Sequence, residues 1–146
     1  MANMVCDSCG KCCINVSAPK RVLSSQSCCY CGETLGVGIA PTQVIKAGTI
    51  LGELKDSKGT FKAFDPYATD GSQIAKGILY HDVCTNEAGN ITNWAGVWGC
   101  GPNEVPMYIC GKFDLRDIAE GDIGIINAAR ASGLPIREIS GWLFLG

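Results

Sequence analysis

Two pairs of cysteines near the N-terminus have the residue types and the spacing of a metal site. Cys6 and Cys9 are separated by two residues and followed by a glycine, and Cys28 and Cys31 repeat this C-x2-C-G pattern. Two residues between thiolates let both sulfurs of a turn point at one ion, and the glycine permits the positive φ with which the chain leaves the turn. Four thiolates around Zn²⁺ would form a closed, structural site, because no position remains open for a substrate.

Other cysteine chemistry stays open beside zinc. The chain has ten cysteines, and Cys12, Cys13 and Cys29 are surplus to a single four-sulfur site in this segment. Disulfides or free thiols are therefore one alternative, and an iron site of the rubredoxin type is another. Three more cysteines follow later in the chain: Cys84, Cys100 and Cys110. One disulfide could form among them, and the sequence does not determine which two are paired.

No catalytic group can be assembled from the sequence. His81 is the only histidine, and in the strand that we predict over residues 77–83 it would face away from Cys84. We therefore interpret His81 as a structural residue, either hydrogen-bonded or exposed. The carboxylates of Asp65, Asp70, Asp82 and Asp114 fall at turns or element ends, where they accept backbone hydrogen bonds. No phosphate loop or nucleophile elbow is present, and we expect no enzymatic activity.

The pattern of short apolar runs between turn residues predicts a mainly β fold with short helices, of the α+β kind. Residues 49–54 and 60–64 read as a β-hairpin joined by the turn at residues 56–59. A turn at Asp70-Gly71 follows, and residues 77–83 form the next predicted strand.

The flanking regions complete this prediction. Residues 33–47 are rich in glycine, and we interpret them as a linker into the domain, whose first strand would be residues 42–45. The C-terminal part is predicted to begin with a strand at 105–109, which has Pro106 at an edge or a strand start, and to continue with a turn or helix at 114–120. A helix is predicted at 123–132 between Asp122 and Gly133, with a core-facing stripe of Ile123, Ile126 and Ala129. One closing strand is predicted at 136–145, with Trp142 and Phe144 on one face.

Composition limits the classes of function. The 146 residues carry a net charge of −2 and are 47% hydrophobic, which suits one domain of ordinary core size plus an appendage. No basic run is present, so we expect no nucleic-acid partner. No apolar stretch reaches the length of about 20 residues that a membrane-spanning helix needs. The N-terminus lacks the apolar centre of a signal peptide, so we expect synthesis in the cytoplasm.

The central stretch resembles the bacteriophage lambda head decoration protein family. The resemblance consists of the hairpin at 51–64, the Asp70-Gly71 turn, and Gly77-Ile78-Leu79 opening the next strand. A second match follows at residues 107–115, where a strand, a glycine, a phenylalanine and an acidic helix start occur in the family's order. A third, weaker match lies at residues 139–145. Residues 1–40 lie outside it, and residues 84–104 look like an insertion.

The resemblance implies a structural virion protein that acts without a catalytic site. Family members are homotrimers on the outside of the expanded capsid, where they cement neighbouring major capsid subunits, and an N-terminal arm adds a strand to the shell. Here we divide the chain into a Cys-rich arm, residues 1–40, and a decoration-like β domain, residues 41–146. The family's arms lack such cysteines, so the possible zinc site is a departure. Residues 33–41 are a second candidate for the capsid-contacting strand.

Two readings from other classes compete with decoration. The C-x2-C-G turns also occur in small rubredoxin-like electron carriers, where iron would colour the protein. A zinc-ribbon adaptor could instead bind a protein partner through Trp94 and Trp98, which lie four residues apart in the predicted insertion. Because thiols that stay reduced in the cytoplasm can oxidise in a released particle, the redox compartment does not decide between metal and disulfide.

Overall fold

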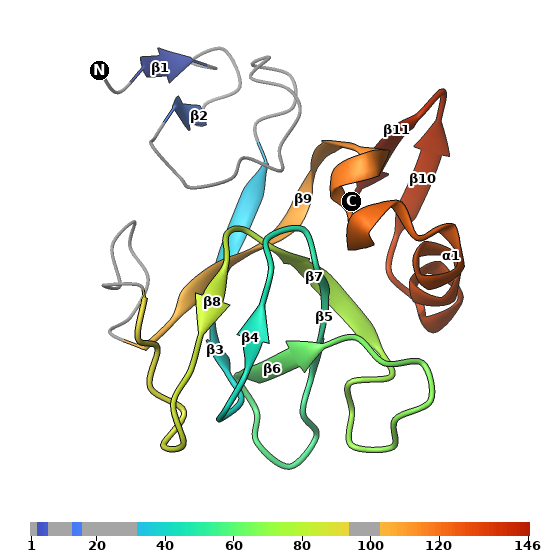
Figure 1. The fold of residues 1–146 in the computed structure, drawn as a ribbon. Helices are drawn as coiled ribbons and strands as arrows, with labels where there is room; N and C mark the ends of the chain where they lie inside the picture. Colours follow the sequence, from blue (N-terminus) through green and yellow to red (C-terminus); the bar gives the residue numbers. More distant parts are fainter. Residues whose placement is uncertain (1–2, 6–12, 16–31, 94–102) are drawn as a thin grey trace.

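Five strands close into a small barrel in the computed structural model (Figure 1), which describes residues 3–5, 13–15, 32–93 and 103–146. The order around the barrel is β3-β6-β5-β7-β9, and pairing of β9 with β3 closes it. All neighbouring pairs are antiparallel except β3 and β6. The barrel strands are β3 (Glu33–Ile39), β5 (Ile50–Glu53), β6 (Thr60–Ala63), β7 (Ala75–Leu79) and β9 (Val105–Asp114).

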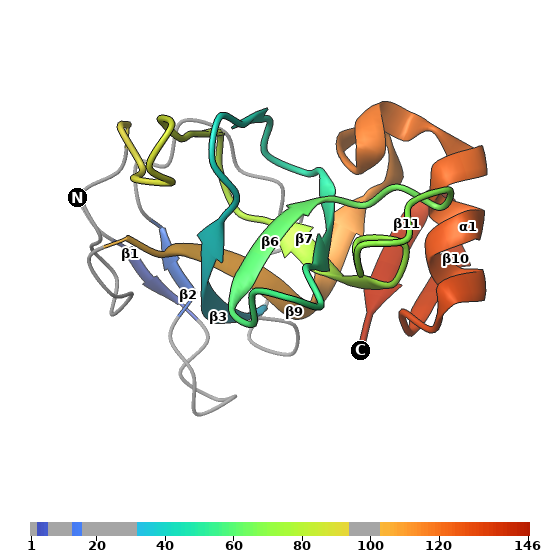
Figure 2. The same cartoon turned by 90° about the horizontal axis from the view of Figure 1, so that it is seen from below.

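The long strand β9 belongs to two sheets. Its first half pairs with β3 and β7 in the barrel, and its second half continues into an antiparallel sheet with β11 (Trp142–Leu145) and β10 (Ile136–Ile139). Figure 2 shows β9 running from the barrel to the unit that contains β10 and β11. The mainly β fold with short helices is therefore confirmed.

Within the described residues, helical structure is confined to the segment between β9 and β10. Two 3₁₀ turns, η3 (Leu115–Asp117) and η4 (Ala119–Gly121), precede helix α1 (Ile123–Ser132). The Asp122 carboxylate caps α1 by accepting hydrogen bonds from the amides of Gly124 and Ile125 at 2.9 and 3.2 Å, and Gly133 ends the helix with a φ of 120°. Both predicted caps are confirmed. In the described part of the chain, no helix has the length and apolarity to cross a membrane.

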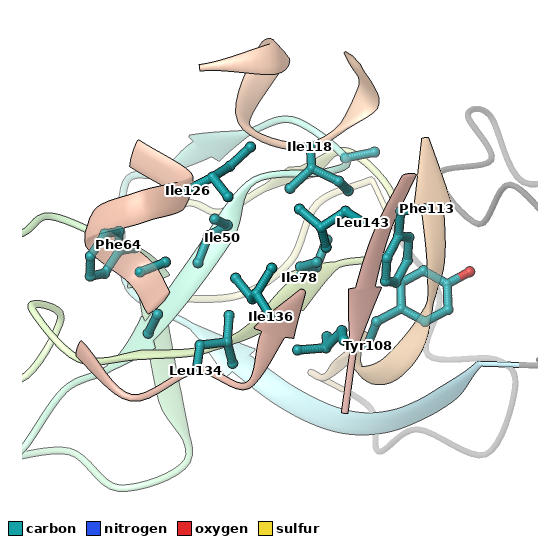
Figure 3. Close-up of a cluster of buried hydrophobic side chains, with 14 residues drawn as sticks. Ile50, Phe64, Ile78, Tyr108, Phe113, Ile118, Ile126, Leu134, Ile136 and Leu143 are labelled. Atoms are coloured by element: carbon teal, nitrogen blue, oxygen red, sulfur yellow. The ribbon is translucent and has the colours of Figure 1, made fainter. Parts of the chain in front are cut away.

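Two hydrophobic clusters share the strands β5, β7 and β9 as a common wall. Figure 3 shows the larger cluster, which α1, the turn carrying Ile118, and the sheet β9-β11-β10 enclose. The smaller cluster fills the barrel. The larger cluster consists of Ala47, Ile50, Phe64, Ala75, Ile78, Tyr108, Phe113, Ile118, Ile126, Ala129, Leu134, Ile136, Leu143 and Leu145; the barrel cluster consists of Val37, Ile39, Ile45, Leu51, Phe61, Leu79, Val83, Val105 and Met107.

Two further strand pairs lie outside these sheets. β4 (Val44–Ile45) pairs with β8 (Val83–Cys84), and β1 (Asn3–Val5) pairs with β2 (Cys13–Asn15), in both cases antiparallel. The predicted first strand at 42–45 thus corresponds to β4, but a strand precedes it.

The interpretation of residues 33–47 as a linker is wrong, because residues 33–39 form the barrel strand β3. Val37 and Ile39 point into the barrel and are 1% and 3% exposed. The glycine content reflects close packing: a Cβ on Gly38 would lie 3.2 Å from the carbonyl oxygen of Gly59. The barrel sheet therefore begins before residue 41, on the arm side of the predicted division.

Three other strand predictions are wrong in their extent. The strand predicted over 105–109 continues to Asp114 as β9. The strand predicted over 77–83 corresponds to β7, which ends at Leu79; beyond it, the Asp82 carboxylate accepts a hydrogen bond from the amide of Ala47 at 2.8 Å. The single strand predicted over 136–145 is a hairpin, with Ser140 and Gly141 at positive φ of 53° and 84° in its two-residue turn. The hairpin β5–β6 is confirmed.

The helical stripe is correct at two of its three positions. Ile126 and Ala129 are fully buried, whereas Ile123 is 42% exposed. Pro106 lies at the start of β9 rather than on an edge, because β9 has neighbours on both sides.

The close approach of β7 and β9 at Gly77 generates a stability prediction. A Cβ at Gly77 would lie 2.6 Å from the carbonyl oxygen of Tyr108 and 2.7 Å from the Met107 sulfur. We expect Gly77→Ala to lower the free energy of unfolding by about 1–3 kcal/mol, because the two strands have to separate. Urea denaturation measures this. Lys76→Ala, at the exposed neighbouring position, is the control and should change it by less than about 0.5 kcal/mol. Equal losses in the two variants would contradict the packing argument.

Candidate interaction surfaces

The loop of residues 65–74, here called the braced loop, is held by the carboxylate of Asp70. One oxygen of Asp70 accepts hydrogen bonds from the amide and the hydroxyl of Ser72 at 3.0 and 2.6 Å, and the other accepts from the Lys62 ammonium at 3.0 Å. These bonds hold the pKa of Asp70 well below its usual range. Ser72 itself is fully buried. The loop is therefore fixed by polar contacts, without a hydrophobic core of its own.

Backbone contact holds the braced loop against the end of β5. The carbonyl of Asp70 accepts a hydrogen bond from the amide of Lys55 at 2.8 Å. Gly71 has a φ of 109°, and a Cβ there would lie 2.4 Å from the carbonyl oxygen of Glu53. Only glycine fits this position. Both residues of the Asp70-Gly71 turn are therefore required: Asp70 for its hydrogen bonds and Gly71 for its missing side chain.

The braced loop presents Tyr67 to solvent. The side chain is 92% exposed, while its backbone amide donates to the Asp65 carboxylate at 2.9 Å. An aromatic side chain on a preordered loop loses little conformational entropy when a partner covers it. Nothing in the sequence pattern singled out Tyr67.

The solvent side of the sheet β9-β11-β10 carries a second surface, here called the aromatic–basic face. Residues that pair across neighbouring strands share a side of the sheet. The register pairs Phe144 with Lys112 and Arg137, and Trp142 with Ile139. The Lys112 ammonium lies 4.6 Å from the centre of the Trp142 ring, and the Arg137 guanidinium lies 5.6 Å from that of Phe144. The expected placement of Trp142 and Phe144 on one face is confirmed.

A third exposed region lies along the first half of β3. Leu35 is 51% exposed, and Ile109 on the paired strand β9 is 40% exposed. β6 pairs with β3 only at Gly38 and Ile39. Within the described residues, no strand pairs with the other edge of β3 before these positions.

The four predicted zinc ligands, Cys6, Cys9, Cys28 and Cys31, all lie outside the described residues, as do Trp94, Trp98 and Cys100. Cys84 and Cys110 are free thiols and half-buried. Among the described residues, no three His, Cys, Asp or Glu side chains are grouped so as to hold a metal ion. The zinc site thus stays a prediction.

His81 is buried and hydrogen-bonded, which is one of the two placements predicted from the sequence. It is 2% exposed, its Nδ1 lies at hydrogen-bond distance from the carbonyl oxygen of Asp82, and the Tyr80 ring meets it edge-on. Burial lowers the pKa of His81. The ring therefore belongs to the turn that leads from β7 to β8.

A family model described as bacteriophage lambda head decoration protein D matches residues 22–94, which is half of the chain. The chain belongs to this family. The matched residues contain the hairpin β5–β6, the braced loop and β7. No curated protein and no solved structure matches the chain.

Membership of the family makes the chain a structural protein of the phage capsid, in agreement with the expectation that it is not an enzyme. The match begins at residue 22, so the family resemblance reaches into residues 1–40, contrary to the sequence-based expectation. The second and third matches that the sequence suggested, at 107–115 and 139–145, lie beyond the matched residues.

The bonds of the Asp70 carboxylate predict a pH dependence of stability. Since the folded-state pKa lies below the unfolded value of about 3.9, the carboxylate stabilises the fold above about pH 4, and this contribution is lost as the pH falls further. We expect Asp70→Asn to be less stable than wild type at pH 6 and to lose less stability between pH 6 and pH 2.5.

Urea denaturation at the two pH values measures this difference. Hydrogen bonds from Arg116 lower the pKa of Asp114 to about 2, so Asp114 adds a pH dependence of stability in the same direction to wild type and variant. Asp56→Asn, at an exposed position, is the matched control and should follow wild type. Identical pH profiles for wild type and Asp70→Asn would contradict the assigned role.

Proposed function

We propose that this chain binds the outside of the expanded phage capsid as a homotrimer and cements neighbouring major capsid subunits. The observation that carries the proposal is the family match over residues 22–94. The braced loop within the match supports it, because hydrogen bonds to Asp70 and the close backbone approach at Gly71 fix the loop that exposes Tyr67.

Mass action explains how such a protein strengthens a shell. A ligand that binds only the expanded lattice stabilises this lattice by an amount that grows with the logarithm of its free concentration over Kd. Three linked copies bind with avidity, so a modest contact in each protomer is sufficient. No chemistry beyond binding is required of the chain.

We assign the contact with the shell to the N-terminal part of the chain and the start of β3. Residues 33–35 are exposed, and strand addition to a capsid loop would supply main-chain hydrogen bonds there. Within the candidate segment, residues 33–41, we favour this first half, because Val37 and Ile39 are buried in the barrel.

Capsid binding can be tested with purified components. We expect the protein to co-sediment with expanded capsids that lack a decoration protein, to saturate, and to raise the temperature at which the shells break. Unexpanded procapsids of the same subunit are the matched control and should bind much less. Equal binding to both shells, or none to expanded shells, would refute the proposal.

We also propose that Cys6, Cys9, Cys28 and Cys31 hold one structural Zn²⁺ per chain, on the spacing argument alone. Native mass spectrometry should find zinc that a chelator removes, and Cys9→Ser should lower the occupancy. Cys84→Ser is the control, because this free thiol lies in the strand β8. A chain that is lighter by two hydrogens per cysteine pair would replace zinc by disulfides, and a coloured, iron-loaded chain would favour an electron carrier.

A further inference from the structure

We propose that the aromatic–basic face is a contact between copies of this chain and that it receives residues 117–123 of the neighbouring copy, here called the acidic segment. The inference deepens the proposed function and rests on its homotrimer, for which it names the surfaces. It is carried by the composition of the face and by a complementary surface on the same chain.

The aromatic–basic face has the make-up of a buried contact, although it lies at the surface. Ile139 is 50% exposed and Trp142 is 37% exposed, and the two pair across β10 and β11. The opposite side of the same strands is filled by Leu143 and Leu145, both fully buried. The sheet thus has one apolar side in the core and a second apolar side that faces outward. An exposed apolar patch of this kind indicates an interaction surface.

The charge of this face is positive. Lys112 and Arg137 lie over the aromatic rings, and the one carboxylate that shares their side of β9, that of Asp114, is already engaged by Arg116 through two hydrogen bonds of 2.6 and 3.0 Å. A partner surface should therefore combine apolar and acidic side chains.

The surface extends to the edge of the sheet. Within the described residues, β10 is an edge strand, and an open groove of about 530 Å³ runs along it. The groove is lined by Arg130, Ile136, Arg137, Glu138 and Ile139, so it contains two cations and one carboxylate. An edge strand that carries an exposed isoleucine is a surface that natural proteins generally cover.

The acidic segment of the same chain has the complementary composition. It carries Asp117, Glu120 and Asp122 within seven residues and ends in Ile123, which is 42% exposed. Glu120 contacts Lys46 at 3.7 Å, but both side chains are largely exposed, so this pair contributes little and leaves Glu120 available. This match of charge and apolarity favours a second copy as the occupant of the face.

The positions of the two surfaces suit a small closed ring. Ile118, fully buried, fixes the acidic segment over one end of the larger cluster, while Phe113 and Leu143 form an adjoining side of that cluster (Figure 3). The aromatic–basic face is the outer surface of this adjoining side. Because the two surfaces lie on adjoining sides, each head-to-tail contact rotates the next copy relative to the previous one. Such contacts form a ring when the rotation closes and an open filament when it does not.

A charge-reversal experiment in the full-length protein tests the contact. We expect Lys112→Glu with Arg137→Glu to raise the concentration at which trimers dissociate by about 100-fold, because like charges would meet across the interface. Asp117→Lys with Glu120→Lys should have a similar effect. All four changes in one chain should restore the trimer, because the two mutated cations then face the two mutated carboxylates with both signs of charge exchanged.

Sedimentation equilibrium and native mass spectrometry report the oligomer, and circular dichroism verifies folding. Lys55→Glu with Lys58→Glu makes the same charge change on the exposed β5–β6 turn and should leave the trimer intact. Trimers that persist in the Lys112→Glu, Arg137→Glu variant, or folded monomers that the four-fold variant does not rescue, would overturn the proposal.

Capsid binding separates this inference from the proposed function. If the Lys112→Glu, Arg137→Glu variant remains trimeric but no longer binds expanded capsids, the face contacts an acidic capsid surface and the inference fails while decoration stands. If wild type binds capsids but is monomeric in solution at all concentrations, the inference fails, and so does the homotrimer of the proposed function. If wild type is trimeric as expected but binds no capsid, only the proposed function fails.

Discussion

The structure depends on a wall of three strands that is buried on both faces. Along β5, β7 and β9, neighbouring residues enter different clusters: Leu79 and Met107 belong to the barrel cluster, whereas Ile78 and Tyr108 belong to the larger cluster. Both clusters therefore require the same strands to pair in one register, and a slip by one residue would exchange the two sets. The absence of a side chain at Gly77, where β7 and β9 meet, allows the backbones to approach closely enough for this pairing.

The continuation of β9 beyond the wall links the core to the surface. Its second half pairs with β11, which places Phe113 in the larger cluster and Lys112 on the outer side. The aromatic–basic face is thus the reverse side of a core sheet, and its shape is as rigid as the packing beneath it. Rigidity of this kind lowers the entropy lost on association, which suits the proposed role of cementing capsid subunits.

Outside the hydrophobic core, polar contacts fix the backbone of the braced loop. The braced loop has little apolar content, yet Asp70, Ser72 and Lys62 fix it through charge-assisted hydrogen bonds, and Gly71 lets it lie on the backbone of β5. The same stretch lies within the family match. A surface loop that is held in this way keeps its geometry without adding to the hydrophobic core, and it leaves Tyr67 available for a partner.

Local chemistry in the sequence was sufficient for the hairpin β5–β6, for the caps of α1 at Asp122 and Gly133, and for the family, because turn and cap residues act over a few positions. The spacing of the N-terminal cysteines predicts a zinc site in the same local way. Only the tertiary structure decided that residues 33–39 are a barrel strand, that β7 stops at Leu79, and that Trp142 and Ile139 face outward beside two cations. The reason is that strand partners distant in sequence determine which glycine-rich segment is buried, where pairing ends, and which side of an alternating strand meets the core.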